Sequence, residues 1–210
     1  MPAKRSSDEA SSADEPKTRP GAPWEATDRA CVERALRERR TINRFQSQLP
    51  PKEWILEALE LARFAPNHKL TNPWRFYLLG RRTVEKVAGL NARLVREAKG
   101  EEAARKKLTR WLEMPGWLAV TQLRSDDRLR EREDYAATAC AIHNLSLALW
   151  TRGVGVKWTS GEVTRHPDFY EAIGADPFEE TCAGLLWYGF PADVPQTRRT
   201  ALHELLHERP

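Results

Sequence analysis

Apolar residues recur along this chain at spacings that predict an alternation of helices and strands. The clearest stripe is Ile55, Ala58, Leu59 and Ala62, at positions i, i+3, i+4 and i+7. This spacing places the four side chains on one face of a helix. Pro66 restricts the conformation of the residue before it, so the helix is predicted to end just before this proline.

The same reading extends along the whole chain. Six helices are predicted, at about 28–40, 51–65, 84–98, 101–112, 128–151 and 167–174, with further helical character after 200. Four or five short strands alternate with them, of which the clearest are 74–79, 117–123, 154–158 and 181–188. Because helices outnumber strands, the pattern favours an α+β fold, in which helices sandwich a sheet, over a doubly wound parallel fold.

The longest predicted helix, 128–151, combines an apolar stripe with many alanines. The stripe runs through Tyr135, Ala139, Ile142, Ser146 and Leu149. Small side chains on the rest of the helix permit close approach of another backbone. Within this helix, His143 is interpreted as a hydrogen-bonded interior or interface residue rather than a ligand.

The N-terminal segment has a different composition. Residues 1–23 are rich in Ser, Ala, Asp, Glu and Pro and contain no Leu, Ile, Val or aromatic residue. Such a stretch cannot bury enough apolar surface to offset the entropy lost on ordering. We therefore expect a disordered tail over 1–27, followed by one domain over 28–210, with no secretory signal or transit peptide.

Composition excludes several classes of protein. The net charge is +4, which is a weak argument for a nucleic-acid partner. The longest apolar runs fall far short of a membrane span, so no membrane protein is expected. The chain has three widely spaced cysteines, Cys31, Cys140 and Cys182, and this pattern does not indicate a disulfide framework. We therefore expect a cytoplasmic protein in which these cysteines are inert buried thiols.

Arginines cluster where the first predicted helix ends. They are Arg37, Arg39, Arg40 and Arg44. Guanidinium groups bind phosphate oxygens two at a time, so such a cluster could hold a phosphorylated cofactor. Cations are also common in the last turn of a helix, where they complement its dipole. From these residues alone both interpretations stay open.

An ordered set of motifs resembles the nitroreductase family of flavoproteins over about residues 28–205. The most similar branch of this family has Asn or Asp, followed by His and Lys, in the Ala-Pro loop. The motifs, in chain order, are Arg39-Arg40-Thr41, Ala65-Pro66-Asn67-His68-Lys69, Asn72-Pro73-Trp74-Arg75-Phe76, Ile142-His143-Asn144-Leu145, Val154-Gly155-Val156-Lys157-Trp158 and Gly189-Phe190-Pro191-Ala192.

The resemblance implies a mainly antiparallel sheet flanked by helices and a homodimer that holds FMN at its interface. It also implies hydride transfer from NAD(P)H to a nitroaromatic, quinone or similar small acceptor by a ping-pong mechanism. Flavin N5 carries that chemistry, so no catalytic protein residue is expected. The residues expected to bind the cofactor are Arg39, Arg40, Thr41, His68, Trp158, Thr159, Ser160 and Arg199.

Three alternatives remain at this stage. His203-Glu204-Leu205-Leu206-His207 matches the H-E-x-x-H pattern of zinc hydrolases. Against that interpretation, the motif suits an amphipathic terminal helix with its leucines turned inward. A flavin enzyme of the same fold could instead catalyse dehalogenation or flavin breakdown. A basic adaptor that binds nucleic acid through the tail and the arginines is the third.

Overall fold

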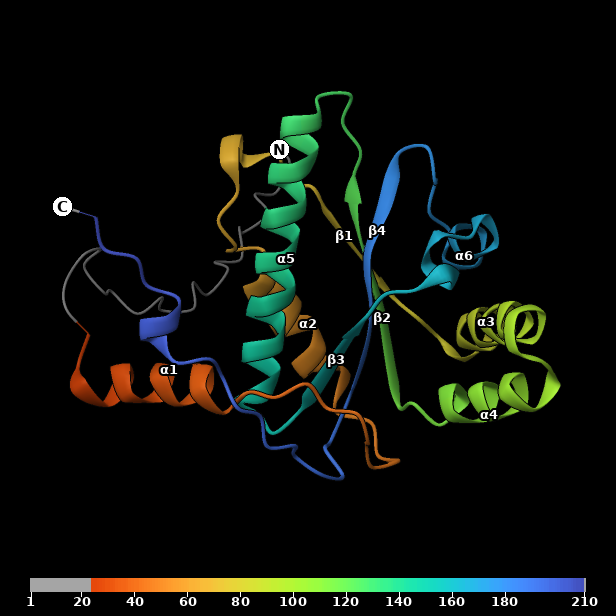
Figure 1. Cartoon of the computed structure of the whole chain (residues 1–210), viewed down its shortest axis with the longest axis horizontal. Helices are drawn as coiled ribbons and strands as arrows, with labels where there is room; N and C mark the ends of the chain where they lie inside the picture. The colour runs from red at the N-terminus through yellow and green to blue at the C-terminus, as the bar shows by residue number, and fades with distance from the viewer. Residues whose placement is uncertain (1–23, 210) are drawn as a thin grey trace, which may run out of the picture.

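The computed structural model describes residues 24–209, and Figure 1 shows helices on both sides of a central sheet. The tail predicted over 1–27 lies almost wholly outside the described residues. The first helix begins at Ala26, following Glu25, and no side chain caps its N-terminus. Over residues 24–209, no helix is both long and apolar enough to cross a membrane.

The sheet has four strands, and every neighbouring pair is antiparallel. This arrangement confirms the expected α+β class and excludes the parallel, doubly wound fold. The two central strands, β2 and β4, are buried along most of their length, which explains their continuous apolar sequence. The spatial order is β1 (Trp74–Leu78), β2 (Gly116–Leu123), β4 (Glu180–Gly189) and β3 (Gly155–Thr159).

The helices divide between the two faces of the sheet. Helices α2 and α5 cover one face, whereas α3, α4 and α6 cover the other (Figure 1). The predicted boundaries hold to within a few residues. The described helices are α1 (Ala26–Glu38), α2 (Lys52–Ala62), α3 (Arg81–Lys99), α4 (Glu101–Leu112), α5 (Arg128–Trp150) and α6 (Pro167–Ile173).

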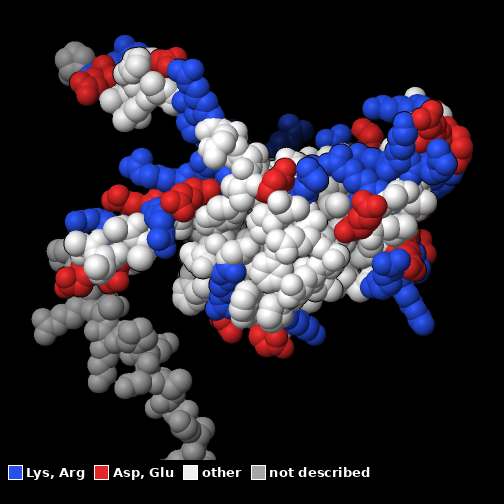
Figure 2. Space-filling model, turned by 90° about the horizontal axis from the view of Figure 1, so that it is seen from below, with Lys and Arg blue, Asp and Glu red and all other residues white. Residues whose placement is uncertain are grey.

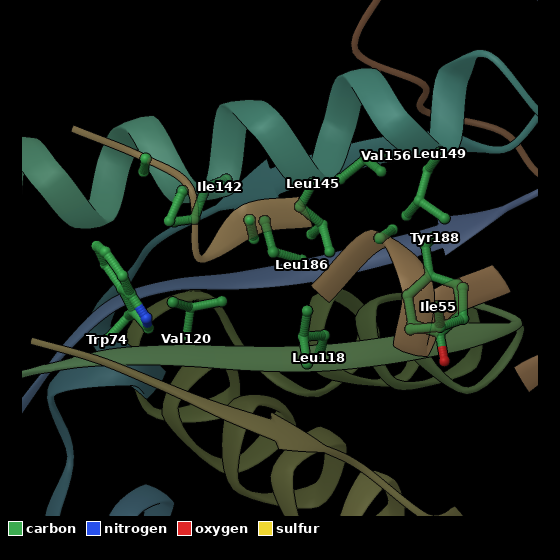
Figure 3. Packing of buried hydrophobic residues seen from close by; sticks show 14 of the residues in the cluster. Ile55, Trp74, Leu118, Val120, Ile142, Leu145, Leu149, Val156, Leu186 and Tyr188 are labelled. Atoms are coloured by element: carbon green, nitrogen blue, oxygen red, sulfur yellow. The ribbon is translucent and has the colours of Figure 1, made fainter. Parts of the chain in front are cut away.

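One hydrophobic core lies between the sheet and the pair α2 and α5. Figure 3 shows Ile142, Leu145 and Leu149 of α5 directed toward Leu118 of β2 and Leu186 of β4. All five side chains are almost completely buried. Each such side chain contributes on the order of 1.5–3 kcal/mol through removal of its apolar surface from water. This core therefore fixes α5 against the sheet.

The second core is built around three tryptophans on the opposite face. Trp111 of α4, Trp117 of β2 and Trp187 of β4 are mutual neighbours, with ring centroids 5.3–5.7 Å apart. Their edge-on and tilted arrangement is the geometry that aromatic rings prefer. Packing of these rings anchors α4 to the sheet.

Two helices differ from the sequence-based expectation. No residue of α1 is buried, so its apolar positions Val32 and Leu36 face solvent in the single chain. On α5, the expected stripe is correct for Ile142 and Leu149, but Tyr135 is exposed. The buried face of α5 is the one that lies between α2 and the sheet, because the helix packs against both.

Candidate functional site

The segment after α1 joins the free edge of the sheet. Thr41 forms a parallel bridge with Val156 of β3, and the Ile42 amide donates a hydrogen bond to the Val156 carbonyl at 3.2 Å. Ile42 is fully buried beside Gly155, where a Cβ atom would lie only 2.3 Å from Ile42 Cγ1. The missing side chain at Gly155 therefore lets the segment Arg39–Ile42 lie against β3.

Arg199, near the other end of the described chain, lies close enough to Arg39 for its charge to act on it. Burial lowers the pKa of the half-buried Arg39 guanidinium, and the charges of Arg199 and then Arg40 lower it further. Over residues 24–209, neither Arg39 nor Arg199 forms an ion pair with a carboxylate. Guanidinium groups gathered in this way, without an acid between them, form an environment that favours a bound anion.

The other two arginines of the sequence cluster have protein partners. Arg40 Nη1 donates to the backbone carbonyls of Arg37 and Arg39, at 2.5 and 3.0 Å, and thereby caps the C-terminal end of α1. Arg44 lies 3.8 Å from the carboxylate of Asp193. The helix-end interpretation is confirmed for Arg40, whereas the phosphate-binding interpretation stays a prediction, with Arg39 free of an ion pair among the described residues.

Trp158 lies on the α5 side of the sheet, near the end of β3. Its indole N–H donates to the Ala183 carbonyl at 3.0 Å, and the side chain is 39% exposed. The ring covers Gly184, where a Cβ atom would lie 2.0 Å from Trp158 Nε1. Thr159 ends the strand, and Ser160 begins the exposed loop after it. Trp158 therefore provides a partly exposed aromatic surface beside the edge of the sheet.

The loop that carries His68 has an unusual backbone. Lys69, Leu70 and Asn72 adopt left-handed conformations, with φ of 58°, 52° and 47°. The Asn67 side chain stabilises the turn, because its Oδ1 accepts a hydrogen bond from the Asn72 amide at 2.7 Å. Left-handed conformations of residues other than glycine cost energy and concentrate at functional sites. The strained turn thus makes this loop a candidate functional segment.

Within one chain, the His68 loop does not meet Arg39. The Thr71 hydroxyl donates to Asp134 Oδ1 at 2.5 Å, which ties the loop to the N-terminal half of α5. The Arg39 segment instead follows β3, which begins just after the C-terminal end of α5 at Trp150 (Figure 1). With a rise of 1.5 Å per residue, these two positions on α5 are about 24 Å apart.

Three residues that shape the site were not identified from sequence. Asp134 is buried on α5, yet in the sequence it is simply one more acid in a charged stretch. Gly155 and Gly184 make room for Ile42 and for the Trp158 ring, respectively. A glycine in a strand can signal close approach of another group, but it does not say which group approaches.

The expected C-terminal helix is absent from the described residues. The H-E-x-x-H segment forms only a short 3-10 turn, Leu202–Glu204, and Leu205 and Leu206 are exposed rather than turned inward. A single turn does not place His203 and His207 on one helical face. Within residues 24–209, no group of three His, Cys, Asp or Glu side chains is arranged to hold a metal ion.

The prediction of buried thiols was wrong for two of the three cysteines, and His143 is not in the interior. Cys31 and Cys140 are exposed, because each lies on the outer face of its helix. Cys182 is partly buried, and burial raises the pKa of its thiol to about 12. His143 is also exposed on α5, so it is no interior residue of the single chain. An interface role for His143 stays a prediction.

Comparison with known proteins identifies relatives along most of the chain. The model of the nitroreductase family matches residues 36–189. The Bacillus subtilis protein YfhC, which carries the name of an NAD(P)H nitroreductase, is 30% identical over 169 residues. The match covers 78% of this chain and 86% of YfhC.

Solved structures share the fold. A nitroreductase-like family protein from Bacillus cereus superposes with a TM-score of 0.75 and 28% identity, over 90% of this chain and 98% of that one. A Desulfovibrio desulfuricans protein described as a nitroreductase, solved in complex with FMN, superposes with a TM-score of 0.66 and 23% identity. That match covers 85% of this chain and 96% of the other.

Proposed function

The chain belongs to the nitroreductase family, and from that premise we propose that it is an FMN-dependent oxidoreductase. The proposed reaction transfers a hydride from NAD(P)H to a nitroaromatic, a quinone or a similar small acceptor. The two substrates occupy the same site in turn, as in a ping-pong mechanism. The FMN complex of the Desulfovibrio desulfuricans protein supports the choice of cofactor.

The observation that carries this proposal is the meeting of Arg39 and Arg199. The charge of the exposed Arg199 acts on the half-buried Arg39, and neither residue forms an ion pair with a carboxylate among the described residues. The phosphate group of FMN is a dianion, and guanidinium groups bind it with charge-assisted hydrogen bonds. The residues present therefore fit the phosphate end of the cofactor.

The remaining predicted residues fit the other parts of FMN. Thr41 follows the arginines along β3 and would bind near the phosphate and ribityl chain. Trp158 provides an aromatic surface for the ring system, and Thr159 and Ser160 follow it where β3 ends, so we propose that they also contact the flavin. FMN, when bound, supplies the hydride chemistry, and the protein's task is to orient the ring and stabilise its charge on reduction.

The separation of His68 from Arg39 supports a homodimer. If two α5 helices pack antiparallel, the N-terminal half of one lies beside the C-terminal half of the other. The His68 loop of one copy then approaches the Arg39 segment of the second copy. Ala136, Cys140 and His143 are exposed at successive turns of α5, and the small side chains of Ala136 and Cys140 permit this close packing.

Two projections from the body also lack a partner within residues 24–209. Figure 2 shows α1 and the C-terminal segment as separate extensions on the left of the view. Val32 and Leu36 on α1, and Leu202 and Leu206 near the C-terminus, are exposed. Burial of such side chains against a second copy would stabilise the assembly, because apolar area removed from water contributes roughly 25 cal/mol per Å².

The proposed cofactor predicts a visible spectrum. We expect the purified protein to be yellow, or to become yellow after incubation with FMN and removal of the excess. The bound flavin should be bleached by NADPH or NADH and restored by a nitroaromatic or quinone. Halogenated phenols are included as acceptors to test the dehalogenation alternative. A protein that stays colourless after incubation with FMN contradicts the proposed function.

The proposed dimer predicts a mass of twice 24.1 kDa in solution. Ala136→Arg places a long charged side chain on the exposed face of α5 and should yield a monomer that binds FMN poorly. The matched control is Ala98→Arg, at an exposed position of α3, which should remain dimeric. Cys140 gives a second readout, because its thiol should label slowly in the dimer and faster in Ala136→Arg. A monomeric wild type would contradict the dimer and the placement of FMN between two copies.

A further inference from the structure

A second cationic site lies on the opposite face of β3. Successive strand residues point to opposite faces of a sheet. Trp158 pairs with Leu186 in the core beside α5, whereas Lys157 pairs with Trp187 in the tryptophan core beneath α4. Lys157 therefore points away from the proposed flavin site, into the layer between the sheet and α3 and α4.

A cavity of about 160 Å³ occupies this layer. It is too small for a flavin, since at about 30 Å³ per water molecule it offers room for roughly five waters. Its lining comes from α3, α4, β3, β4 and the loop after β3. The lining residues are Asn91, Lys107, Arg110, Trp111, Lys157, Thr159, Ser160, Gly161, Val163, Thr164, Leu185 and Trp187.

Three of these lining residues are cations, and none is an acid. Burial lowers the pKa of the Lys157 ammonium, and the charges of Arg110 and then Lys107 lower it further. The pKa of Lys107 is lowered in the same way, by burial first and then by Arg110. Among residues 24–209, no carboxylate forms an ion pair with any of the three. The cavity thus concentrates positive charge that the described protein leaves uncompensated.

The same cavity wall holds buried hydrogen-bond donors without partners. Asn91 Nδ2, Trp111 Nε1 and Trp187 Nε1 have no hydrogen-bond acceptor among the described residues, and each side chain is more than nine-tenths buried. An unpaired buried donor costs about 1–3 kcal/mol, so native proteins rarely leave one unsatisfied. The three residues line the cavity, and their donor atoms are themselves buried, so they lie beneath its wall rather than open to it.

The lysines are held in position by the tryptophan rings. Lys107 Nζ lies 5.8 Å from the centroid of Trp111, and Lys157 Nζ lies 5.3 Å from that of Trp187. Each contact is a cation–π interaction, which restricts the position of the ammonium group. Because the rings neutralise no charge, the ammonium groups remain available to an anion, and little side-chain ordering is lost when it binds.

Helix α4 extends the basic surface outward from the cavity. Figure 2 shows basic side chains gathered on the right of the view, the side on which α4 lies in Figure 1. Arg110 lines the cavity and also an outer groove. This outer groove is lined as well by Arg44, Arg105 and Lys106. A surface of one sign of charge raises the local concentration of counter-ions and speeds their association.

We propose that this cavity binds a compact tetrahedral oxyanion, namely phosphate or a terminal phosphate monoester. Lys157, Lys107 and Arg110 provide its charge complement. Since Thr159 and Ser160 stand between this cavity and Trp158, an anion bound here lies next to the proposed flavin site while remaining separate from it.

The test is a calorimetric titration of the FMN-loaded protein with inorganic phosphate. The ionic strength is held constant, and chloride is the reference anion. We expect saturable binding, weakened about tenfold or more in Lys157→Met and in Arg110→Gln, because each removes one charge-assisted contact. Lys106→Met is the matched control, since Lys106 is adjacent on α4, pairs with Glu102 and does not line the cavity. Glycerol phosphate in place of phosphate distinguishes a monoester from the free anion.

Either of two results would overturn the proposal. One is an absence of saturable binding, or equal binding by Lys157→Met, Arg110→Gln and the wild type. The other is loss of phosphate binding in Arg39→Gln with full retention in Lys157→Met, which would assign the anion to the arginine cluster. Retained circular dichroism of each variant ensures that a loss reports the site. The phosphate titration does not depend on the proposed enzyme activity, because it measures binding directly.

Discussion

Arg39→Ala should weaken FMN binding about tenfold to a hundredfold. A hydrogen bond to a charged group is worth roughly 1.5–3 kcal/mol, and each 1.4 kcal/mol is a factor of about ten in affinity. Arg39 is half-buried beside Arg199, so its interaction with a phosphate is less screened by water than that of a surface arginine. Fluorescence titration of the FMN-free protein measures the change.

Three comparisons make this result specific to the cluster. Arg39→Lys keeps the charge but loses the planar fork, so its affinity should lie between those of the wild type and the alanine variant. Arg34→Ala, at an exposed position of α1, should bind FMN like the wild type. Without FMN, Arg39→Ala should be no less stable, because removal of one cation relieves repulsion with Arg199. Equal affinities of the Arg39 and Arg34 variants would refute the assignment.

Gly155→Ala should destabilise the protein and reduce FMN affinity at the same time. The added Cβ would lie 2.3 Å from Ile42 Cγ1 and 2.9 Å from Ile42 Cβ, and the latter atom cannot move without the backbone. Overpacking of this kind costs about 1–3 kcal/mol. Relief of the clash requires the Arg39–Ile42 segment to shift away from β3, and Arg39 moves with it. Urea unfolding measures the first effect, and FMN titration measures the second.

A second glycine supplies the control for this substitution. Gly89 lies on the exposed side of α3, and a Cβ there would meet nothing within 4 Å. Gly89→Ala should raise the free energy of unfolding by up to about 1 kcal/mol, because alanine favours the helix, and leave FMN affinity unchanged. If Gly155→Ala were as stable as the wild type, the close packing of Ile42 on β3 would not be the reason for a glycine there.

Most elements were predictable from local signals. The stripe Ile55, Ala58 and Ala62 is buried as expected, and α4 spans the predicted residues 101–112. Gly174, with φ of 77°, ends α6 as predicted, because glycine adopts a left-handed conformation without steric cost. These signals succeed because helix periodicity and the effects of proline and glycine act within a few residues.

The errors occurred where burial depends on distant partners. Leu36 and Leu206 have the apolar character of core residues, yet nothing in the described part of the chain covers them. Cys140 lies in an apolar helix but on its outer face. Periodicity identifies an apolar face without identifying what packs against it, so these positions could not be classified from sequence alone.

The candidate site divides in the same way. The sequence by itself determined the types of side chain and their order, which were sufficient for the family and for a phosphate-binding interpretation of the arginines. Only the tertiary structure decided that Arg199 acts on Arg39 and that Arg40 caps α1. It also decided that the His68 loop is tied to the N-terminal half of α5, apart from Arg39. The reason is physical: long-range electrostatic and packing interactions depend on distances in space, and these exist only once the strands have paired.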